Sequence, residues 1–537
     1  MSEAPTPSDQ PTRDRIVSDF GRNFLVEAGA GSGKTYSLAM RMAAGVERGA
    51  FEVDGMAAVT FTRKAAAELR GRFQEALEDR LRCAPGDDER RRLRGALDGI
   101  ERLFAGTIHA FCAHLLRERP VDAQVAPCFE ELGDADNVLL RKQAWRDFLV
   151  ERRAAGWRPL LDLFEAGVRP WELDGGIASV CEHEDVEFDM GSGEPPEAAP
   201  VWKEVDRFWA RLEALAPPEF PEETTCPLQR RFDEYDGRIR LARRDRVASL
   251  AEFCKAWKRD VVQKHWAGRG KQVKTLVDDF TSTVVEPFLE AWRAYVHHLA
   301  MIVLADARAS YAEVRRRRNV VNYVDLLRVT ARMLRERRAV RRALQAKYRW
   351  LFIDEFQDTD PIQAEIFLML AAAEAASPGN GDGGTAVDPF ALPLRPGSLF
   401  VVGDPKQSIF RFRRADIDIY NRVGDRIVVT GGERLLLTAN FRSLPGVCAL
   451  ANQVFPPLFG KLSLPWSPPF QPLHPVRPEA EGGPGPTVAK LTLPETKKAP
   501  EATRQEAAAI ARYIKGEMAA GRRKAGDFLV LTRFRPR

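Results

Sequence analysis

The feature that most constrains the fold lies near the start of the chain, where an apolar segment, a run of small residues and a helical pattern follow one another. Residues 24–26 (FLV) predict a short strand, and residues 27–35 (EAGAGSGKT) lead into apolar positions on one helix face, at Leu38 and Met42. Glycine lets backbone N–H groups approach an anion closely, and the start of a helix adds partial positive charge. This order therefore predicts a phosphate-binding loop within an α/β fold.

Two side chains of this loop have chemical roles at a nucleotide. The Lys34 ammonium would neutralise the β- and γ-phosphates, and the Thr35 hydroxyl would ligate magnesium, so ATP and Mg2+ are the predicted cofactors. The alternative is a structural turn that contains GKT by chance. The glycines and the flanking pattern favour the loop, although alanine stands where the motif begins with glycine. The predicted ATP-binding residues are Ala28, Gly29, Ala30, Gly31, Ser32, Gly33, Lys34 and Thr35.

An acidic motif follows a second apolar segment far downstream. Residues 348–353 (YRWLFI) predict a buried strand, which ends in Asp354 and Glu355. Acidic residues at the carboxyl edge of a parallel sheet lie where such folds bind ligands. Asp354 would hold magnesium and Glu355 would polarise the attacking water. Alone, the pattern is also typical of a strand followed by an exposed turn; together with the phosphate loop it predicts a hydrolytic site.

Two further segments add candidate residues. A strand at 399–403 leads into Gln407, whose amide would report on the γ-phosphate, and into Phe410 and Phe412, whose flat faces suit base stacking. Arg442 follows another apolar run and offers a planar, permanently charged fork for a phosphate. The alternatives are that the two phenylalanines are core residues and that Arg442 is a surface ion-pair partner.

Six segments in this order resemble the superfamily 1A helicases of the UvrD/RecB type. The segments are AGAGSGKT (28–35), TFTRKAAAELR (60–70), GTIHAFC (106–112), IDEFQDTD (353–360), VGDPKQSIFRFR (402–413) and LTANFRS (437–443). The residue sequences of these segments are most similar to those of the AddA/RecB helicase–nuclease (exodeoxyribonuclease V beta) branch. The resemblance implies a RecA-like P-loop NTPase lobe, in which helices flank a parallel sheet, with a large helical insertion and the beginning of a second RecA-like lobe.

The resemblance also implies roles for individual residues. It assigns the nucleotide contacts to Lys34, Thr35, Asp354, Glu355, Gln407 and Arg442. It assigns contacts with single-stranded DNA to Thr60, Phe61, His109, Phe410 and Phe412. The family has an adenine-contacting glutamine before the loop, for which Gln10 is the candidate, although Arg13 lies nearer the usual place. Arg414 stands where the family commonly has glycine.

The function implied by the resemblance is an ATP-dependent DNA helicase or translocase that moves 3′-to-5′ along single-stranded DNA in repair or recombination. Its expected partners are single-stranded and duplex DNA and a helicase–nuclease partner subunit. Two alternatives stay open. One is a DNA-stimulated ATPase that acts as a switch without unwinding, and the other is a non-catalytic fragment or interaction subunit.

The order of the motifs predicts a first lobe that is split in the sequence. The expected domains are 1–130 and 320–440 (the first RecA-like lobe), 131–319 (a mainly helical insertion) and 441–537 (the start of a second RecA-like lobe). In the last of these, residues 505–518 predict an amphipathic helix and residues 527–533 a strand. Neither the family's later motifs nor a RecB-type nuclease carboxylate cluster follows. We therefore expect the isolated chain to be an incomplete motor that binds ATP weakly and does not unwind DNA.

The amino-acid composition is compatible with these expectations, but it does not by itself identify the function. Charged residues make up 29% of the chain and the formal net charge is +5, which suits a folded soluble protein and permits a polyanionic partner. No apolar run is long enough to cross a membrane, and the polar start has no signal core. These features predict a cytoplasmic protein without membrane contact.

A basic segment in the expected insertion is interleaved with Trp257 and Trp266. Its cations are Lys255, Lys258, Arg259, Lys264, Arg269, Lys271 and Lys274. Alternating cations and aromatic rings are typical of a DNA contact surface. A solvated basic helix face is the alternative.

Overall fold

The chain divides into two compact units. The computed structural model describes residues 6–191, 193–220, 224–242, 244, 246–257, 260–373, 388–459, 468–478, 487–494 and 499–532. Among these residues, the first unit comprises those within 6–107, 344–373 and 388–532, and the second comprises those within 108–343. These limits differ from the domain boundaries expected near 130 and 320, and the division into four domains stays a prediction.

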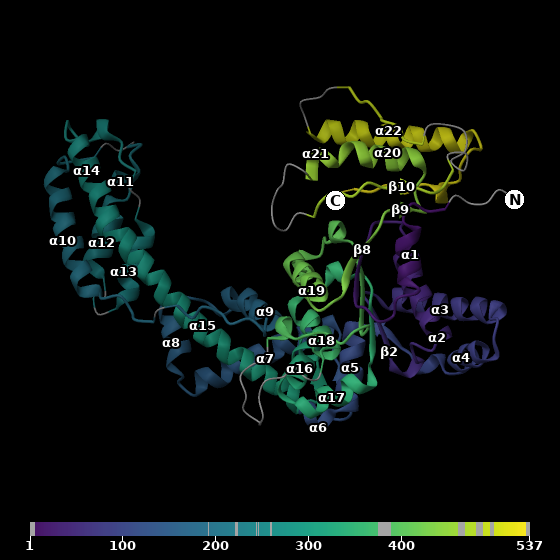
Figure 1. Ribbon diagram of the computed structural model, residues 1–537. Helices are drawn as coiled ribbons and strands as arrows, with labels where there is room; N and C mark the ends of the chain where they lie inside the picture. Colours follow the sequence, from purple (N-terminus) through teal and green to yellow (C-terminus); the bar gives the residue numbers. More distant parts are fainter. Residues whose placement is uncertain are drawn as a thin grey trace. The chain divides into compact units, whose positions relative to one another are not determined.

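The first unit is built on a six-stranded sheet whose neighbouring strands are all parallel (Figure 1). In spatial order the strands are β3 (Phe104–Thr107), β2 (Met56–Thr60), β6 (Trp350–Ile353), β7 (Leu399–Gly403), β1 (Phe24–Ala28) and β8 (Glu433–Leu437). Because β6 and β7 lie between β2 and β1, segments from before and after the second unit form one sheet. The strands predicted within 24–26, 348–353 and 399–403 are present, and the α/β fold class is confirmed.

Helices cover both faces of this sheet, which explains why its four inner strands are almost entirely buried on both sides. They are α2 (Lys34–Glu47), α3 (Arg63–Cys83) and α4 (Asp87–Asp98) on one face, and α18 (Pro361–Ala371) and α19 (Ile417–Val429) on the other (Figure 1). Alternate strand residues, such as Phe24 and Val26, point towards α2 and α3 and join their hydrophobic core. The sheet thereby places the carboxyl ends of its strands along a single edge.

Small elements follow β8 in the first unit. The two-residue strand β9 (Ala439–Asn440) pairs in parallel with β10 (His474–Pro475), and α20 (Pro445–Val454) lies between them in the sequence. The helix predicted at 505–518 is confirmed as α22 (Ala499–Ala519).

The strand predicted at 527–533 is wrong for the residues that the structure describes. Residues 528–532 form no strand, and Leu529 and Leu531 are 84% and 85% exposed; residue 533 lies outside the described part. A strand needs a neighbour that satisfies its backbone N–H and C=O groups. No described segment pairs with this one, so apolar residues alone do not make it a strand.

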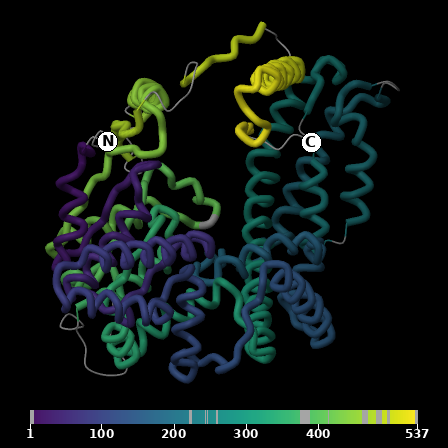
Figure 2. Tube along the Cα trace, turned by 90° about the vertical axis from the view of Figure 1, so that its right-hand side faces the viewer, coloured from purple at the N-terminus to yellow at the C-terminus, as the bar shows by residue number. Residues whose placement is uncertain are grey.

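The second unit is mainly helical, and its described strands, β4 (Glu130–Glu131) and β5 (Val320–Val321), have two residues each. Its longer helices include α5 (Ile108–Glu118), α7 (Asp134–Ala154), α10 (Ala198–Leu215), α13 (Val247–Ala256), α14 (Gly270–Phe280), α15 (Glu286–Arg317) and α16 (Tyr323–Glu336). Helices α10, α13, α14 and the first half of α15 run side by side (Figure 2). In the described part of the chain, no helix combines the length and apolarity needed to cross a membrane.

The tryptophans of the predicted basic and aromatic surface lie inside the second unit. Trp257 and Trp266 are 7% and 0% exposed and belong to one hydrophobic cluster with residues of α10, α13 and α14. The expectation that these rings alternate with cations on a DNA contact surface is therefore wrong. Large aromatic rings are stabilised by burial, and here neighbouring helices supply the apolar surface. Lys258 and Arg259 lie outside the described residues.

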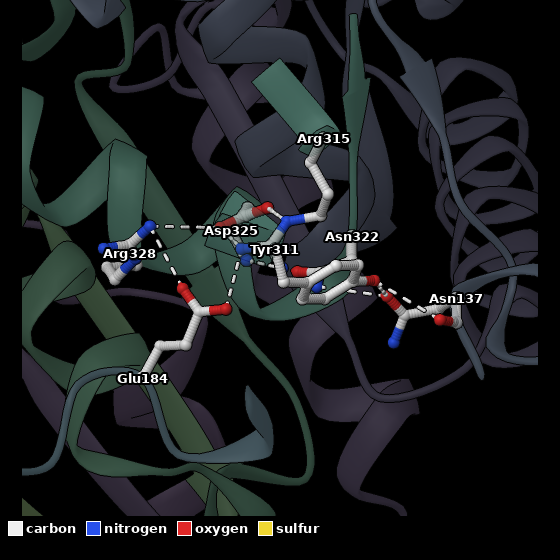
Figure 3. A network of polar contacts seen from close by, with 7 residues as sticks. All are labelled: Asn137, Glu184, Tyr311, Arg315, Asn322, Asp325 and Arg328. Carbon is white, nitrogen blue, oxygen red and sulfur yellow. Dashed lines mark hydrogen bonds and ion pairs between the residues drawn. The ribbon is translucent and has the colours of Figure 1, made fainter. Parts of the chain in front are cut away.

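A buried cluster of charges ties the end of α15 to the start of α16 (Figure 3). The Arg315 side chain, which is 2% exposed, donates from Nε to Asp325 and from Nη2 to Glu184, both at 2.7 Å. Arg328 lies 3.2 Å from each of the two carboxylates. Two cations thus face two anions, and the Asn322 side chain caps α16 by accepting from the Asp325 amide. The cluster fixes the first turn of α16.

Replacing Arg315 should therefore destabilise the second unit. We expect Arg315→Met to lower the free energy of unfolding by about 3–5 kcal/mol, because the two buried carboxylates of Glu184 and Asp325 would then face only one cation, the partly exposed Arg328. Arg316→Met is the matched control: Arg316 is 73% exposed and pairs with Glu313 on the helix surface, where solvent screens the ion pair, so we expect a much smaller loss of stability than for Arg315→Met. Urea unfolding followed by tryptophan fluorescence measures both. Equal losses in the two variants would contradict a stabilising role for the buried cluster.

Candidate nucleotide-binding site

The loop between β1 and α2 depends on two glycines with left-handed backbone. Gly31 and Gly33 have φ angles of 78° and 84°, which favour glycine because it has no Cβ. At Gly31, a Cβ atom would also lie 2.6 Å from the Cβ of Arg442. Gly33 is the N-cap of α2, so Lys34 begins the helix. The predicted order of strand, loop and helix is present, and Arg442 lies directly against the loop.

Donors from other segments hold the backbone of this loop. The carbonyl oxygens of Ala30, Gly31 and Ser32 accept hydrogen bonds from Asn440 Nδ2 (2.7 Å), the Phe441 amide (2.8 Å) and Arg13 Nη2 (2.9 Å), respectively. Asn440 Oδ1 also accepts from the Arg442 amide at 3.0 Å. The loop and the segment that carries Arg442 are therefore one hydrogen-bonded unit. Nothing in the residue type of Asn440 indicates this contact, which joins segments far apart in the sequence.

The two predicted nucleotide motifs meet at the edge of the sheet. Lys34 Nζ donates to Glu355 Oε2 at 2.9 Å, and Thr35 Oγ1 donates to Asp354 Oδ2 at 3.0 Å. Asp354 and Glu355 directly follow β6, and Lys34 and Thr35 begin the helix after β1. In a parallel sheet these positions share the carboxyl edge, where ligands bind. The structure thus brings together the four residues to which ATP and Mg2+ contacts are assigned.

The environment of the two carboxylates is unusual. Burial, reinforced by the negative charge of Glu355, raises the pKa of Asp354 to about 6. The backbone of Glu355 is left-handed, with φ 54° and ψ 42°, a conformation that is uncommon for residues other than glycine. Such backbone conformations concentrate at functional sites, where surrounding contacts maintain them.

Gln407 is connected to this group through two other residues, Asp404 and Gln357. Its Nε2 donates to Asp404 Oδ2 at 2.8 Å, and the Asp404 amide donates to Gln357 Oε1 at 2.9 Å. Gln357 Nε2 in turn donates to Glu355 Oε2 at 2.7 Å. The structure therefore connects Gln407 to Glu355 indirectly. Gln357 and Asp404 lie inside the quoted motifs, but their side-chain contacts were not predicted.

A cavity of about 640 Å³ adjoins the loop, and both candidates for the base contact line it. Its wall includes Gln10, Arg13, Gly33, Tyr36 and Phe441. Gln10 Nε2 donates to Asp14 at 2.7 Å, within the same helix turn.

Arg13 is held differently from Gln10. Its guanidinium donates to both oxygens of Asp9, from Nε at 2.8 Å and from Nη2 at 3.0 Å, and lies over the ring of Phe441 at 4.9 Å. The Asp9 carboxylate also accepts from the Thr438 and Ala439 amides. Both residues line the cavity; Arg13 is held by several contacts from other segments, whereas Gln10 is held by one hydrogen bond within its own helix.

The departure at Arg414 has a structural consequence. This residue has a φ of 69°, in the left-handed region that a glycine adopts without strain. The chain keeps the backbone conformation that suits the family's usual glycine, although an arginine stands there.

Three phenylalanines from two segments form an aromatic group in the first unit. Phe61 and Phe410 stack with ring centroids 5.2 Å apart, and Phe412 lies 5.7 Å from Phe410. Phe412 is 77% exposed. Thr60 is buried at the end of β2, and its hydroxyl donates to the Thr62 carbonyl. Of these candidates, Phe412 offers the most open face for a nucleobase.

The remaining candidate, His109, lies in the second unit. Its ring meets that of Tyr323 edge-on, with centroids 5.1 Å apart, and burial lowers the pKa of its imidazole against the opposing effect of Glu131 and Asp134. Tyr323, which sequence reasoning missed as a candidate, is the first residue of α16, and the Asn322 side chain before it caps that helix.

Comparisons with known proteins place these observations in a family. A sequence model of the UvrD/REP helicase N-terminal domain matches residues 9–427. The A subunit of the ATP-dependent helicase/nuclease of Ligilactobacillus salivarius is 25% identical over 507 residues, which cover 83% of this chain and 38% of that protein. The protein of the same name from Levilactobacillus brevis is 26% identical over 511 residues, again covering 38% of its length.

The matches to the relatives and the match to the family model cover different shares of the proteins compared. This chain spans less than half the length of both relatives, whereas the family match extends over most of the chain and includes the phosphate loop, the Asp354–Glu355 pair and Gln407. With this match and the geometry of the nucleotide site, the chain belongs to the UvrD/REP helicase family.

Proposed function

We propose that the chain provides the ATP-binding part of an ATP-dependent DNA helicase or translocase that acts on single-stranded DNA. The observation that carries this proposal is the pairing of Lys34 with Glu355 and of Thr35 with Asp354 at one edge of the sheet. Movement in the 3′-to-5′ direction, a role in repair or recombination and a cytoplasmic location belong to the proposal. They rest on the family resemblance.

The site can bind ATP by exchanging partners. The nucleotide phosphates would take the Lys34 ammonium from Glu355, which leaves that carboxylate available to polarise a water molecule. The Thr35 hydroxyl and the Asp354 carboxylate, 3.0 Å apart, are the oxygen ligands that Mg2+ prefers, so these residues fit the ion. Bound there, Mg2+ would neutralise charge on the β- and γ-phosphates.

Contacts around these residues support further assignments. Arg442 lies against Gly31, so its permanently charged fork can reach a phosphate at the loop. Gln10 lines the cavity beside Gly33 and Tyr36, where its amide can contact the adenine base. Gln407 would report on the γ-phosphate through its link to Glu355.

Single-stranded DNA would bind through the stacking of its bases on aromatic rings and through the charge of its phosphate backbone. Phe412 presents an exposed ring, Phe410 and Phe61 support it, and Thr60 positions the segment that carries Phe61. In the second unit, His109 with Tyr323 is the corresponding candidate contact. Binding of this kind tolerates any base sequence and weakens steeply with salt.

We also propose that the chain acts on duplex DNA and assembles with a helicase–nuclease partner subunit. The relatives are named as subunits of a helicase/nuclease, which favours assembly with another protein chain. A DNA-stimulated ATPase that switches without unwinding would use the same nucleotide site, and strand separation of a forked duplex distinguishes the two. A non-catalytic interaction protein is less well supported, because it would not need the paired acidic and basic residues.

Lys34→Ala should abolish ATP turnover while the fold is retained. Lys34 begins a helix whose loop is shaped by glycines, so its removal takes away charge rather than packing. Steady-state phosphate release and far-ultraviolet circular dichroism measure the two properties. Lys515→Ala, on the exposed surface of α22, is the control and should keep wild-type turnover. ATPase activity that survives Lys34→Ala would end the phosphate-loop assignment.

Glu355→Gln should separate binding from hydrolysis. The change keeps the shape of the side chain but removes the base, so we expect ATP to bind with little change and hydrolysis to slow by about 10²-fold or more. Filter binding and single-turnover hydrolysis test the two steps. Loss of ATP binding with an unchanged rate per bound ATP would show that Glu355 has another role.

Phe412→Ala should weaken binding of single-stranded DNA by about 1–3 kcal/mol if a base stacks on its exposed ring. Phe410→Ala should have a smaller effect, because Phe410 packs on Phe61. Tyr513→Ala is a control on another exposed ring, on α22. Fluorescence anisotropy with labelled oligothymidylate measures these affinities. Equal affinities for wild type and Phe412→Ala would remove Phe412 from the DNA site.

A further inference from the structure

Both ends of one buried amide side chain, that of Gln357, are used in hydrogen bonds. Gln357 is 2% exposed and lies two residues after Glu355. Its Nε2 donates to Glu355 Oε2 at 2.7 Å, and its Oε1 accepts from the Asp404 amide at 2.9 Å. The side chain therefore bridges the proposed general base and the first residue after β7.

The contact continues into the loop that follows β7. Asp404, which is also buried, accepts from Gln407 Nε2 at 2.8 Å and pairs with Lys406 Nζ at 2.9 Å. The carbonyl oxygen of Gln357 accepts from Ser408 Oγ at 3.0 Å. Gln357 is thus attached to this loop at two points, through its side chain and through its backbone.

The Gln357 amide can approach the end of β7 only because a small residue stands there. At Gly403 a Cβ atom would lie 2.9 Å from Gln357 Oε1, so the glycine lets the amide reach the end of β7. The same loop then continues to Phe410, which stacks on Phe61. One hydrogen-bonded path therefore runs from Glu355 to the segment that carries the exposed ring of Phe412.

One carboxylate oxygen of Glu355 accepts two hydrogen bonds, and this arrangement indicates how the path can orient the proposed base. Oε2 accepts from both Lys34 Nζ and Gln357 Nε2. When phosphate takes the Lys34 ammonium, the Gln357 amide is the described donor that still holds this oxygen. A neutral amide orients a carboxylate without cancelling its charge, so the base keeps both its direction and its negative charge.

We propose that Gln357 is a positioning residue that orients Glu355 towards the attacking water and makes this orientation depend on the position of the 404–412 loop. When single-stranded DNA occupies the aromatic group, it fixes the loop and thereby fixes Glu355. DNA stimulation of ATP hydrolysis then passes through Gln357. This inference rests on the proposed function and names a means by which DNA regulates the same site.

The first test compares two buried glutamines in the full chain. Gln357→Leu removes both hydrogen bonds at nearly constant size. Gln345→Leu makes the same substitution at a buried glutamine that donates to the Met369 carbonyl. The readouts are kcat and KM for ATP, with and without saturating oligothymidylate.

For Gln357→Leu we expect kcat to fall about 10-fold to 100-fold, by analogy with the loss of an outer partner that orients a metal-ligating side chain, while KM changes less than threefold. The ratio of DNA-stimulated to unstimulated kcat should fall towards one. Gln345→Leu should keep the wild-type ratio. Equal stimulation ratios in wild type and Gln357→Leu would overturn the proposal.

A second variant breaks one end of the bridge and covers the case in which Gln357→Leu does not fold. Gln357→Glu keeps the length and an oxygen for the Asp404 amide. When its carboxyl is ionised it has no donor for Glu355 and repels that carboxylate, so this variant is compared with wild type at alkaline pH. Because the coupling needs both ends, we expect kcat and the stimulation ratio to fall as in Gln357→Leu. A wild-type stimulation ratio in Gln357→Glu would contradict the inference.

A double-mutant comparison distinguishes positioning from general support of the fold. In the Glu355→Gln background, Gln357→Leu should cause no further loss of hydrolysis, because both changes act on the same step. Multiplying losses would show that Gln357 acts independently of Glu355 and would overturn the inference. If the wild-type chain neither binds nor hydrolyses ATP, the proposed function itself fails, whatever the variants do.

Discussion

The ion pair between Lys34 and Glu355 joins segments that are 321 residues apart in the sequence. It can form because β6 and β7 insert between β2 and β1, which brings the residues after β6 to the same sheet edge as the phosphate loop. Residues 108–343 lie between these segments and form the second compact unit. The nucleotide site therefore requires the sheet to assemble from both parts of the chain.

The ion pair is one of two described contacts that join the phosphate loop to the acidic residues after β6. Lys34 balances the negative charge of Glu355, and the Thr35 hydroxyl donates to Asp354, whose pKa burial raises to about 6. Each group that would contact phosphate or Mg2+ thus has a protein partner that it can exchange. The loop backbone is held separately, by Asn440, Phe441 and Arg13, so this exchange needs no rearrangement of the loop.

Sequence reasoning was most successful where local chemistry determines structure. Glycines with left-handed backbone, an apolar strand before them and a helix after them all lie within a few residues, so the phosphate loop could be predicted. The pair at Asp354 and Glu355 could be predicted for the same reason. The structure shows where these residues lie, and the chemical roles assigned to them stay predictions, as do those assigned to Gln407, Arg442 and the aromatic residues.

Contacts between distant segments could not be predicted. Trp257 and Trp266 have neighbours of mixed polarity in the sequence, and only the packing of helices shows that both are buried. Leu529 and Leu531 lie in an apolar run typical of a strand, yet no described strand pairs with it. The bonds of Gln357 to Glu355 and Asp404 depend on the adjacency of β6 and β7, which residue types do not reveal.

The most direct test of the account is the structure of the chain with a non-hydrolysable ATP analogue and Mg2+. We predict that Lys34 Nζ leaves Glu355 and contacts the β- and γ-phosphates, that Thr35 and Asp354 face the metal ion, and that Gln357 still donates to Glu355. A bound analogue that leaves the Lys34–Glu355 pair intact and places its phosphates away from the loop would contradict it.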